Sequence, residues 1–196
     1  MQYTGALQNI TTSKPMALKA SIFKVNLDIS DMDRHYYQSH ALTLARHPSE
    51  TDLRMMVRVV AFALNAHEEL AFTKGLSTQD EPDLWNKSLS DEIELWVDLG
   101  QPDEKRIRQA CGKAKQVVIY GYQGRQAGPW FKQVEPSLKR FDNLRVIQFP
   151  SEQAESLAQM VSKNMSLQIS IQDGEVFISN EDTQTTVTPE QLFPVQ

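Results

Sequence analysis

Strict alternation of apolar and polar residues marks segment 92–99 as a β-strand. Its odd-numbered residues are apolar, whereas its even-numbered residues are three acids and a tryptophan. A period of two places the apolar residues on one face of a sheet, which we expect to be the core face. Gly100 then permits a turn, and Pro102 suits the first turn of a helix. The segment predicts a strand, a tight turn and a helix, with Glu94 and Asp98 on the same strand face.

Other segments show the same two kinds of pattern. Alternation over 21–30, followed by a turn and a returning strand over 36–46, predicts a long antiparallel hairpin. Helical spacing of apolar residues predicts a helix over 50–67, with Ser49 as its N-cap. The apolar run 116–122 predicts a strand buried on both faces. The remaining expected elements are strands at 69–73, 81–85, 144–149 and 185–188, helices at 129–140 and 151–163, and a hairpin over 165–178.

Length and composition favour one domain over residues 16–196. The chain has 196 residues, of which 40% are hydrophobic, so it can bury one sizeable core. Residues 1–15 are polar and unpatterned, and the strand pattern begins only after Met16. We therefore expect residues 1–15 to be a poorly ordered leader.

Charge and cysteine content exclude several classes of protein. The net charge of −5 argues against nonspecific wrapping of nucleic acid, although it permits a local basic groove. Cys111 is the only cysteine, which excludes a disulfide framework and indicates a reducing, cytoplasmic location. No apolar run approaches ~18 residues, so no membrane-spanning helix and no membrane partner are expected.

The order of the expected elements and several blocks of the sequence carry a resemblance to known families. The expected order over 50–122 is helix, three strands, helix and strand, with acids on the middle strands. This order resembles the core of the PD-(D/E)XK nuclease superfamily. The resemblance implies an α/β domain with a mixed sheet, a variant of the restriction-endonuclease-like core that N- and C-terminal antiparallel hairpins extend. A second resemblance rests on the blocks MALKASIFK (16–24), LTLARHPSET (42–51), RMMVR (54–58), FTKGLSTQDEPDLW (72–85), ELWVDLGQPDEKRI (94–107) and MSLQISIQDG (165–174). With these blocks in this order, the chain from Met16 resembles the YaeQ family.

Family membership alone does not establish an activity, so any chemistry must be inferred from the individual residues. A nuclease of this fold needs carboxylates that hold Mg²⁺ or Mn²⁺, which prefer oxygen ligands. By position, Asp83 resembles the first acid of the nuclease motif, Glu94 the second acid, and Glu50 the accessory acid on the first helix. Asp98 adds a further acid on the strand face of Glu94.

The chain departs from the nuclease motif at its lysine. That cation steadies the phosphoryl charge and helps to activate water, but Trp96 stands in its place. Lys105, on the following helix, is the candidate to take over the role. The predicted catalytic residues are Glu50, Asp83, Glu94, Asp98 and Lys105, and the predicted metal ligands are Asp83, Glu94 and Asp98.

Arginines near these acids leave two interpretations open. Crowded carboxylates raise each other's pKa, so positive charge must lie among them. Either a metal ion or the arginines can supply it. The arginines predicted to contact nucleic acid, or alternatively to pair with the acids, are Arg54, Arg58, Arg106 and Arg108.

Two functions follow from these interpretations. The first is a metal-dependent phosphodiesterase, or nuclease, that acts on nucleic acid with Mg²⁺ or Mn²⁺, neither of which is required for folding. The second is a non-enzymatic cytoplasmic binding or regulatory module that keeps a degenerate nuclease fold.

Overall fold

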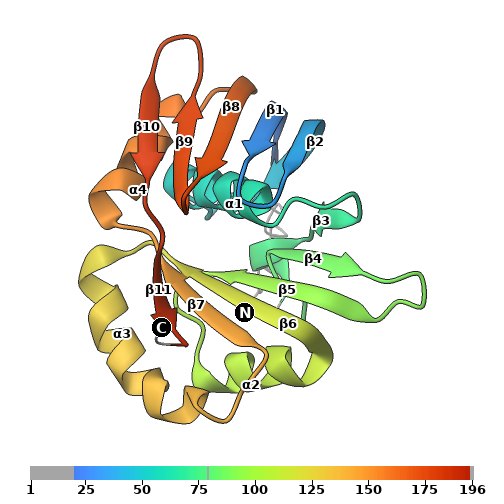
Figure 1. Cartoon of the computed structure of the whole chain (residues 1–196), viewed down its shortest axis with the longest axis vertical. Helices are drawn as coiled ribbons and strands as arrows, with labels where there is room; N and C mark the ends of the chain where they lie inside the picture. The colour runs from blue at the N-terminus through green and yellow to red at the C-terminus, as the bar shows by residue number, and fades with distance from the viewer. Residues whose placement is uncertain (1–19, 79, 195–196) are drawn as a thin grey trace, which may run out of the picture.

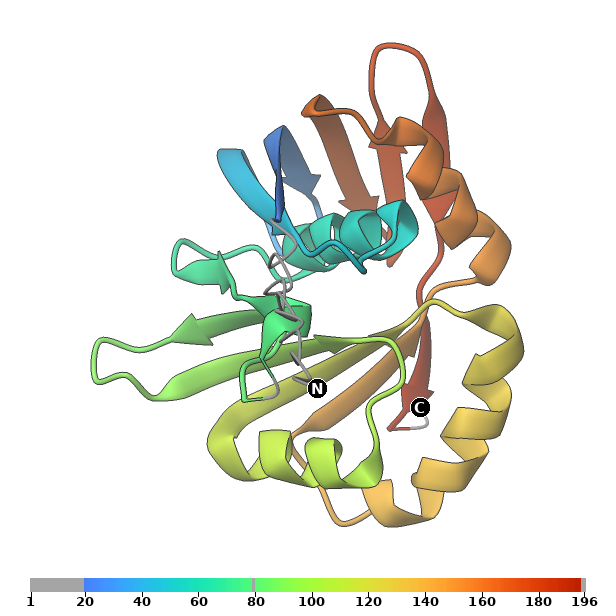
Figure 2. The same ribbon diagram turned by 180° about the vertical axis from the view of Figure 1, so that it is seen from behind.

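The chain folds into alternating layers of sheet and helix (Figures 1 and 2). The structure is a computed structural model, and it describes residues 20–78 and 80–194. The expected leader, residues 1–15, lies outside the described residues. From top to bottom in Figure 1, the layers are a five-stranded sheet, helices α1 and α4, a six-stranded sheet, and helices α2 and α3. The helices are α1 (Asp52–Leu64), α2 (Glu104–Lys113), α3 (Gly124–Leu138) and α4 (Ser151–Leu157), with short 3₁₀ turns at Gly75–Ser77 and Ala158–Met160.

The upper sheet combines the hairpins from both ends of the described chain. Its strand order is β10-β9-β8-β1-β2, and β1 pairs with β8 in parallel although about 140 residues separate them. We expected these hairpins to extend the core sheet. They form a second sheet instead, because the apolar faces of β1 and β8 bury themselves against α1. The strands are β1 (Ser21–Asp31), β2 (Tyr36–Arg46), β8 (Asn164–Gln172), β9 (Glu175–Ser179) and β10 (Gln184–Val187).

The lower sheet holds the predicted central strand. Its order is β11-β7-β6-β5-β4-β3, with β5, β6 and β7 parallel and the other neighbours antiparallel. The expected order of helix, three strands, helix and strand is present as α1, β3, β4, β5, α2 and β6. The edge strand β11 was not predicted, since it is short and lies between two prolines. The strands are β3 (Leu70–Phe72), β4 (Leu84–Lys87), β5 (Ile93–Leu99), β6 (Ala114–Gly121), β7 (Leu144–Gln148) and β11 (Glu190–Phe193).

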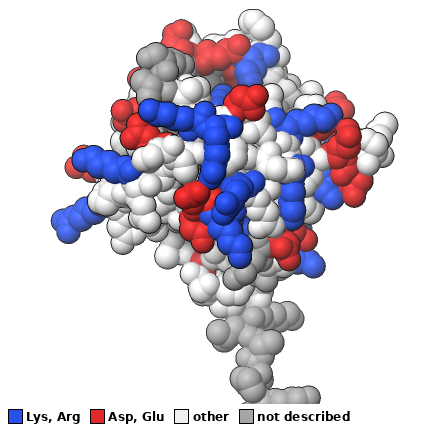
Figure 3. All heavy atoms as spheres, turned by 90° about the horizontal axis from the view of Figure 1, so that it is seen from below, with Lys and Arg blue, Asp and Glu red and all other residues white. Residues whose placement is uncertain are grey.

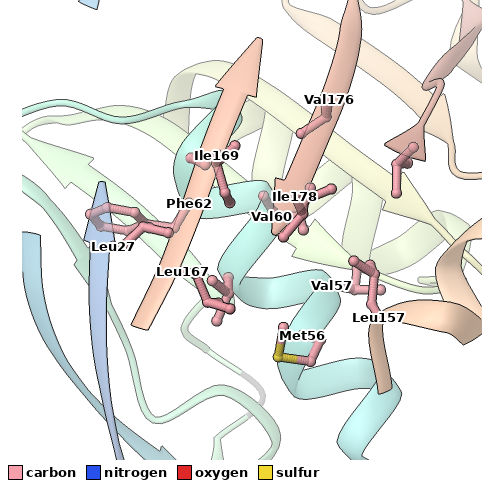
Figure 4. Close-up of a cluster of buried hydrophobic side chains, with 14 of the residues drawn as sticks. Leu27, Met56, Val57, Val60, Phe62, Leu157, Leu167, Ile169, Val176 and Ile178 are labelled. Atoms are coloured by element: carbon pink, nitrogen blue, oxygen red, sulfur yellow. The ribbon is translucent and has the colours of Figure 1, made fainter. Parts of the chain in front are cut away.

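Helix α1 is buried on all sides because it lies between the two sheets. All nine residues of segment 55–63 are buried, whereas the sequence predicted one apolar stripe beside a polar one. A helix that is apolar nearly all round needs such a central position. Figure 4 shows its side chains, including Met56 and Val60, packed against Leu27, Leu167 and Ile169 of the upper sheet.

Strand β5 is also buried on both faces in its second half. Val97 and Leu99 belong to the core that contains α1, and Leu95 packs against it, which confirms the predicted core face for these residues. Ile93, which was predicted on the same face, packs against the second core instead. Trp96 belongs to a second core between the lower sheet and helices α2 and α3, and it is only 1% exposed. Asp98, on the same face as Trp96, is 3% exposed. An acid at such a position needs specific partners.

Candidate functional site

Two buried aspartates lie close together, Asp83 directly before β4 and Asp98 on the neighbouring strand β5. The Asp83 backbone N–H donates to the Val97 carbonyl oxygen at 2.9 Å, and the Leu99 N–H donates to Asp83 Oδ2 at 2.9 Å. Asp83 is therefore fastened to the residue on each side of Asp98. Both aspartates line one cavity of about 280 Å³.

Arg106 neutralises Asp98 from the first turn of α2. That helix begins at Glu104 because Asp103 caps it, and Asp103 Oδ1 accepts from the Arg106 N–H at 2.8 Å. Nε and Nη2 of Arg106 donate to the two oxygens of Asp98 at 2.9 and 2.8 Å, a bidentate pair. The guanidinium carbon also lies 5.5 Å from the centre of a Trp96 ring. Burial raises the pKa of Asp98, and the pairing with Arg106 opposes that rise.

Glu50 and two arginines of α1 form a buried chain of ion pairs that reaches Asp83. Arg54 donates from Nη1 to Glu50 Oε1 at 3.1 Å and from Nη2 to Asp83 Oδ1 at 2.6 Å. Arg58 Nη2 donates to Glu50 Oε2 at 3.0 Å. Burial lowers the pKa of Arg58. Burial also opposes the charged form of Arg54, but the combined attraction of Asp83 and Glu50 raises the pKa of Arg54. Arg54 and Arg58 lie one turn apart on the same side of α1, and Glu50 lies just before the helix. The predicted start was wrong, because Thr51 rather than Ser49 caps α1 and its side chain accepts from the Arg54 N–H.

The loop around Gly75 borders the cavity, which two further polar side chains also line. Gly75 has a φ of +50°, and a Cβ there would lie 3.3 Å from Asp83 Oδ1, so the site requires the glycine. Thr78 Oγ1 and Gln101 Nε2 are buried without a hydrogen-bond partner among the described residues, and both residues line the cavity. Sequence analysis identified none of these three residues. The signal that the sequence offered was their place in the family blocks, Gly75 and Thr78 in 72–85 and Gln101 in 94–107.

Glu94 does not join the other acids. It precedes Asp98 by four residues, and a strand rises ~3.3 Å per residue, so the two positions are about 13 Å apart along β5. Its Oε1 instead accepts from Lys115 Nζ at 2.7 Å, in a pair that water reaches. The shared strand face was predicted, but four residues of extended chain separate the two carboxylates.

The predicted cation Lys105 also lies outside the acid cluster. Lys105 and Arg108 are exposed on α2. Lys105 borders a neighbouring cavity of about 390 Å³ together with Arg106. The cation that contacts an aspartate from α2 is therefore Arg106, one residue further along.

The residues present suit a hydrated metal ion held by two acids. Within residues 20–78 and 80–194, no three His, Cys, Asp or Glu side chains are arranged to hold one metal ion. Mg²⁺ usually takes one or two carboxylates and keeps several waters. Asp83 and Asp98 meet this requirement, whereas Glu94 lies too far along the strand to take part.

The fold and site define a mixed α/β protein with two mixed sheets and a buried cluster of carboxylates and arginines. The chain belongs to the YaeQ family, whose model, described as YaeQ protein, matches residues 16–189. Within the described residues, no helix is long and apolar enough to cross a membrane.

Relatives and solved structures agree with this assignment. The chain is 43% identical to the uncharacterized protein YaeQ of Salmonella typhi, over 84% of this chain and 91% of that protein. It is 42% identical to the uncharacterized protein YaeQ of Escherichia coli K12, over 85% of this chain and 92% of that protein. The crystal structure of YaeQ from Xanthomonas axonopodis pv. citri is 46% identical, has a TM-score of 0.86, and is matched over 88% of this chain and 98% of that one. The crystal structure of YaeQ from Pseudomonas syringae is 35% identical and has a TM-score of 0.84. It is matched over 88% of this chain and 96% of that one.

Proposed function

We propose that the chain is a metal-dependent phosphodiesterase that acts on nucleic acid, built on a variant of the restriction-endonuclease-like core. The observation that carries the proposal is the attachment of Asp83 to both neighbours of Asp98, which brings two buried carboxylates to one cavity. The order α1, β3, β4, β5, α2 and β6 supports the same assignment.

Each group at the cavity has a role in this proposal. Asp83 and Asp98 hold Mg²⁺ or Mn²⁺, which when bound polarises a phosphoryl oxygen and lowers the pKa of a bound water. Arg106 takes the place of the expected lysine and offsets charge that develops on the phosphate. The Gln101 side-chain amide and the Thr78 hydroxyl, which have no hydrogen-bond partner in the described part of the chain, can donate to phosphate oxygens. Lys105 lies beside Arg106, where it can contact a neighbouring phosphate.

The charge distribution supports nucleic acid as the substrate. Residues 100–145 contain ten Lys or Arg and four Asp or Glu. The rest of the chain contains ten Lys or Arg and 21 Asp or Glu. Figure 3 shows Lys and Arg side chains gathered, with acids between them, on the face below α2 and α3. A local excess of positive charge attracts a phosphate backbone even when the whole chain is acidic. The exposed Lys105 and Arg108 belong to this segment.

A second candidate is a non-enzymatic binding or regulatory module. The observation that favours it is the state of the buried carboxylates, since all six oxygens of Glu50, Asp83 and Asp98 accept an N–H. Five of these six hydrogen bonds come from arginine. The cluster is therefore neutral without a metal ion, and its role in this case is to fix α1, β5 and α2 relative to one another.

Metal binding separates the two candidates. For the phosphodiesterase, millimolar Mn²⁺ raises the melting temperature by a few degrees, because binding to the folded form contributes about 2.7 kcal/mol at a hundredfold excess over Kd. The double variant Asp83→Asn, Asp98→Asn loses this response, and the matched control Glu94→Gln keeps it. If wild type shows no response and cleaves no single- or double-stranded DNA or RNA in Mn²⁺, the phosphodiesterase is rejected in favour of the binding module.

A further inference from the structure

The two sheets have four edge strands, and three of them are protected against pairing with another chain. An edge strand exposes unpaired N–H and C=O groups that can template a further strand. The edges β3, β10 and β11 are only three or four residues long. In addition, the pairing of β11 with β7 is irregular, and Pro194 follows β11 directly. Short length, irregular pairing and proline are the usual means of blocking an edge.

The fourth edge, β2, has none of these protections. It is 11 residues long and pairs with β1 at all eleven positions without a bulge. It contains no proline, and its only Lys, Arg, Asp or Glu is the terminal Arg46. Figure 1 shows β2 at the outer edge of the upper sheet, and among the described strands only β1 pairs with it. About half of the backbone N–H and C=O groups of an edge strand point away from its neighbour.

We propose that β2 pairs antiparallel with β2 of a second copy of this chain, about a two-fold axis at Ala41. The two five-stranded sheets then become one sheet of ten strands. This interface is isologous, because each copy contributes the same strand.

The sequence of β2 is complementary to itself in this register, which is why a second copy is the partner. Positions whose numbers sum to 82 face each other, so Tyr37 lies opposite Ala45 and Ser39 lies opposite Thr43. These pairs match an aromatic ring with a small side chain and one hydroxyl with another, both favourable across strands. The terminal charge, Arg46, lies opposite Tyr36 and can stack on its ring. No like charges meet along the strand.

Light scattering of the purified full chain tests the proposal. Wild type has twice the chain mass of 22.3 kDa. Ala41→Lys places two ammonium groups at the two-fold axis, and we expect the dimer dissociation constant to rise by about tenfold or more. The matched control is Asn26→Lys on β1, because Asn26 is the cross-strand partner of Ala41 and both side chains are exposed. This control adds the same charge one strand inside the edge and leaves the dimer intact.

A disulfide cross-link tests the register. Facing residues of antiparallel strands have Cα atoms about 4.5–5.5 Å apart, within the range of a disulfide. In a Cys111→Ser background, Ala41→Cys therefore forms a covalent dimer under mild oxidation. Asn26→Cys does not, because its counterpart lies three strand spacings away, about 14 Å.

Two results would overturn the proposal. One is a wild-type chain that stays monomeric at all concentrations measured, which would leave the β2 edge to a strand of another protein. The other is a dimer that Ala41→Lys does not weaken and Ala41→Cys does not cross-link, which would place the interface elsewhere.

Discussion

At the scale of single residues, Asp98 is subject to two opposing effects. Burial raises the pKa of its carboxyl group above the ordinary value of 3.8, and the bidentate pair with Arg106 lowers it, with burial the larger effect. An acid whose pKa is raised by folding binds more protons in the native state than in the unfolded state. Its ionisation therefore costs stability as the pH rises above 3.8.

This balance predicts how Asp98→Asn changes the pH dependence of stability. Well below pH 3.8 the Asp98 carboxyl is protonated in both the native and the unfolded state and resembles asparagine. As the pH rises from there, the free energy of unfolding of wild type should fall relative to that of Asp98→Asn. Urea unfolding at a series of pH values, followed by circular dichroism, measures the difference. A difference that grows in favour of wild type would mean that Arg106 outweighs burial.

At the scale of elements, helix α1 places the ion pairs of Arg54 and Arg58 in the interior of the protein. Arg58 is 2% exposed, and Glu50 is the only acid within salt-bridge distance of it among the described residues. Arg54 has a second acid, Asp83. Removing one partner of a buried pair leaves an uncompensated charge in the core.

We therefore predict that Glu50→Ala lowers the free energy of unfolding by about 3–5 kcal/mol. Glu94→Ala is the matched control, because the ion pair of Glu94 with Lys115 is exposed to water and its loss should change stability little. Urea denaturation of both variants measures the contrast. Equal losses would show that the α1 cluster is no more important to the fold than a surface pair.

At the scale of the whole molecule, α1 packs against both sheets, so we expect them to unfold as one cooperative unit. One continuous core contains residues of both sheets and of α1, and a second core lies below the lower sheet. All three tryptophans, Trp85, Trp96 and Trp130, lie in the lower sheet or in α3. Tryptophan fluorescence therefore reports on the lower half, whereas circular dichroism reports on both sheets.

A substitution in the upper sheet should accordingly destabilise the lower half. Leu27 is fully buried against α1, and Leu27→Ala should cost about 2–5 kcal/mol. We predict one urea transition by fluorescence and by circular dichroism, and the same shift of both in Leu27→Ala. A fluorescence transition that Leu27→Ala leaves unchanged would show that the sheets unfold separately.

Local patterns determined much of the fold without any structure. Alternation identified β5 and its core face, and it also predicted the hairpins β1–β2 and β8–β9. These features depend on neighbours a few residues apart, which is the range over which hydrophobic periodicity carries information. The resemblance to known families directed attention to Glu50 and Asp83, and the alternation of β5 added Asp98. The fold brings these three acids into one cluster.

Only the tertiary structure decided which charges meet. Glu94 and Asp98 share a strand face, but extended chain separates them by about 13 Å, so just one of them reaches Asp83. On α2, adjacent residues point about 100° apart, so Arg106 faces the acids while Lys105 faces solvent. The parallel pairing of β1 with β8 spans about 140 residues, and no local pattern encodes which distant strand is the partner. The second sheet, the full burial of α1 and the arginine-neutralised cluster all follow from that long-range packing.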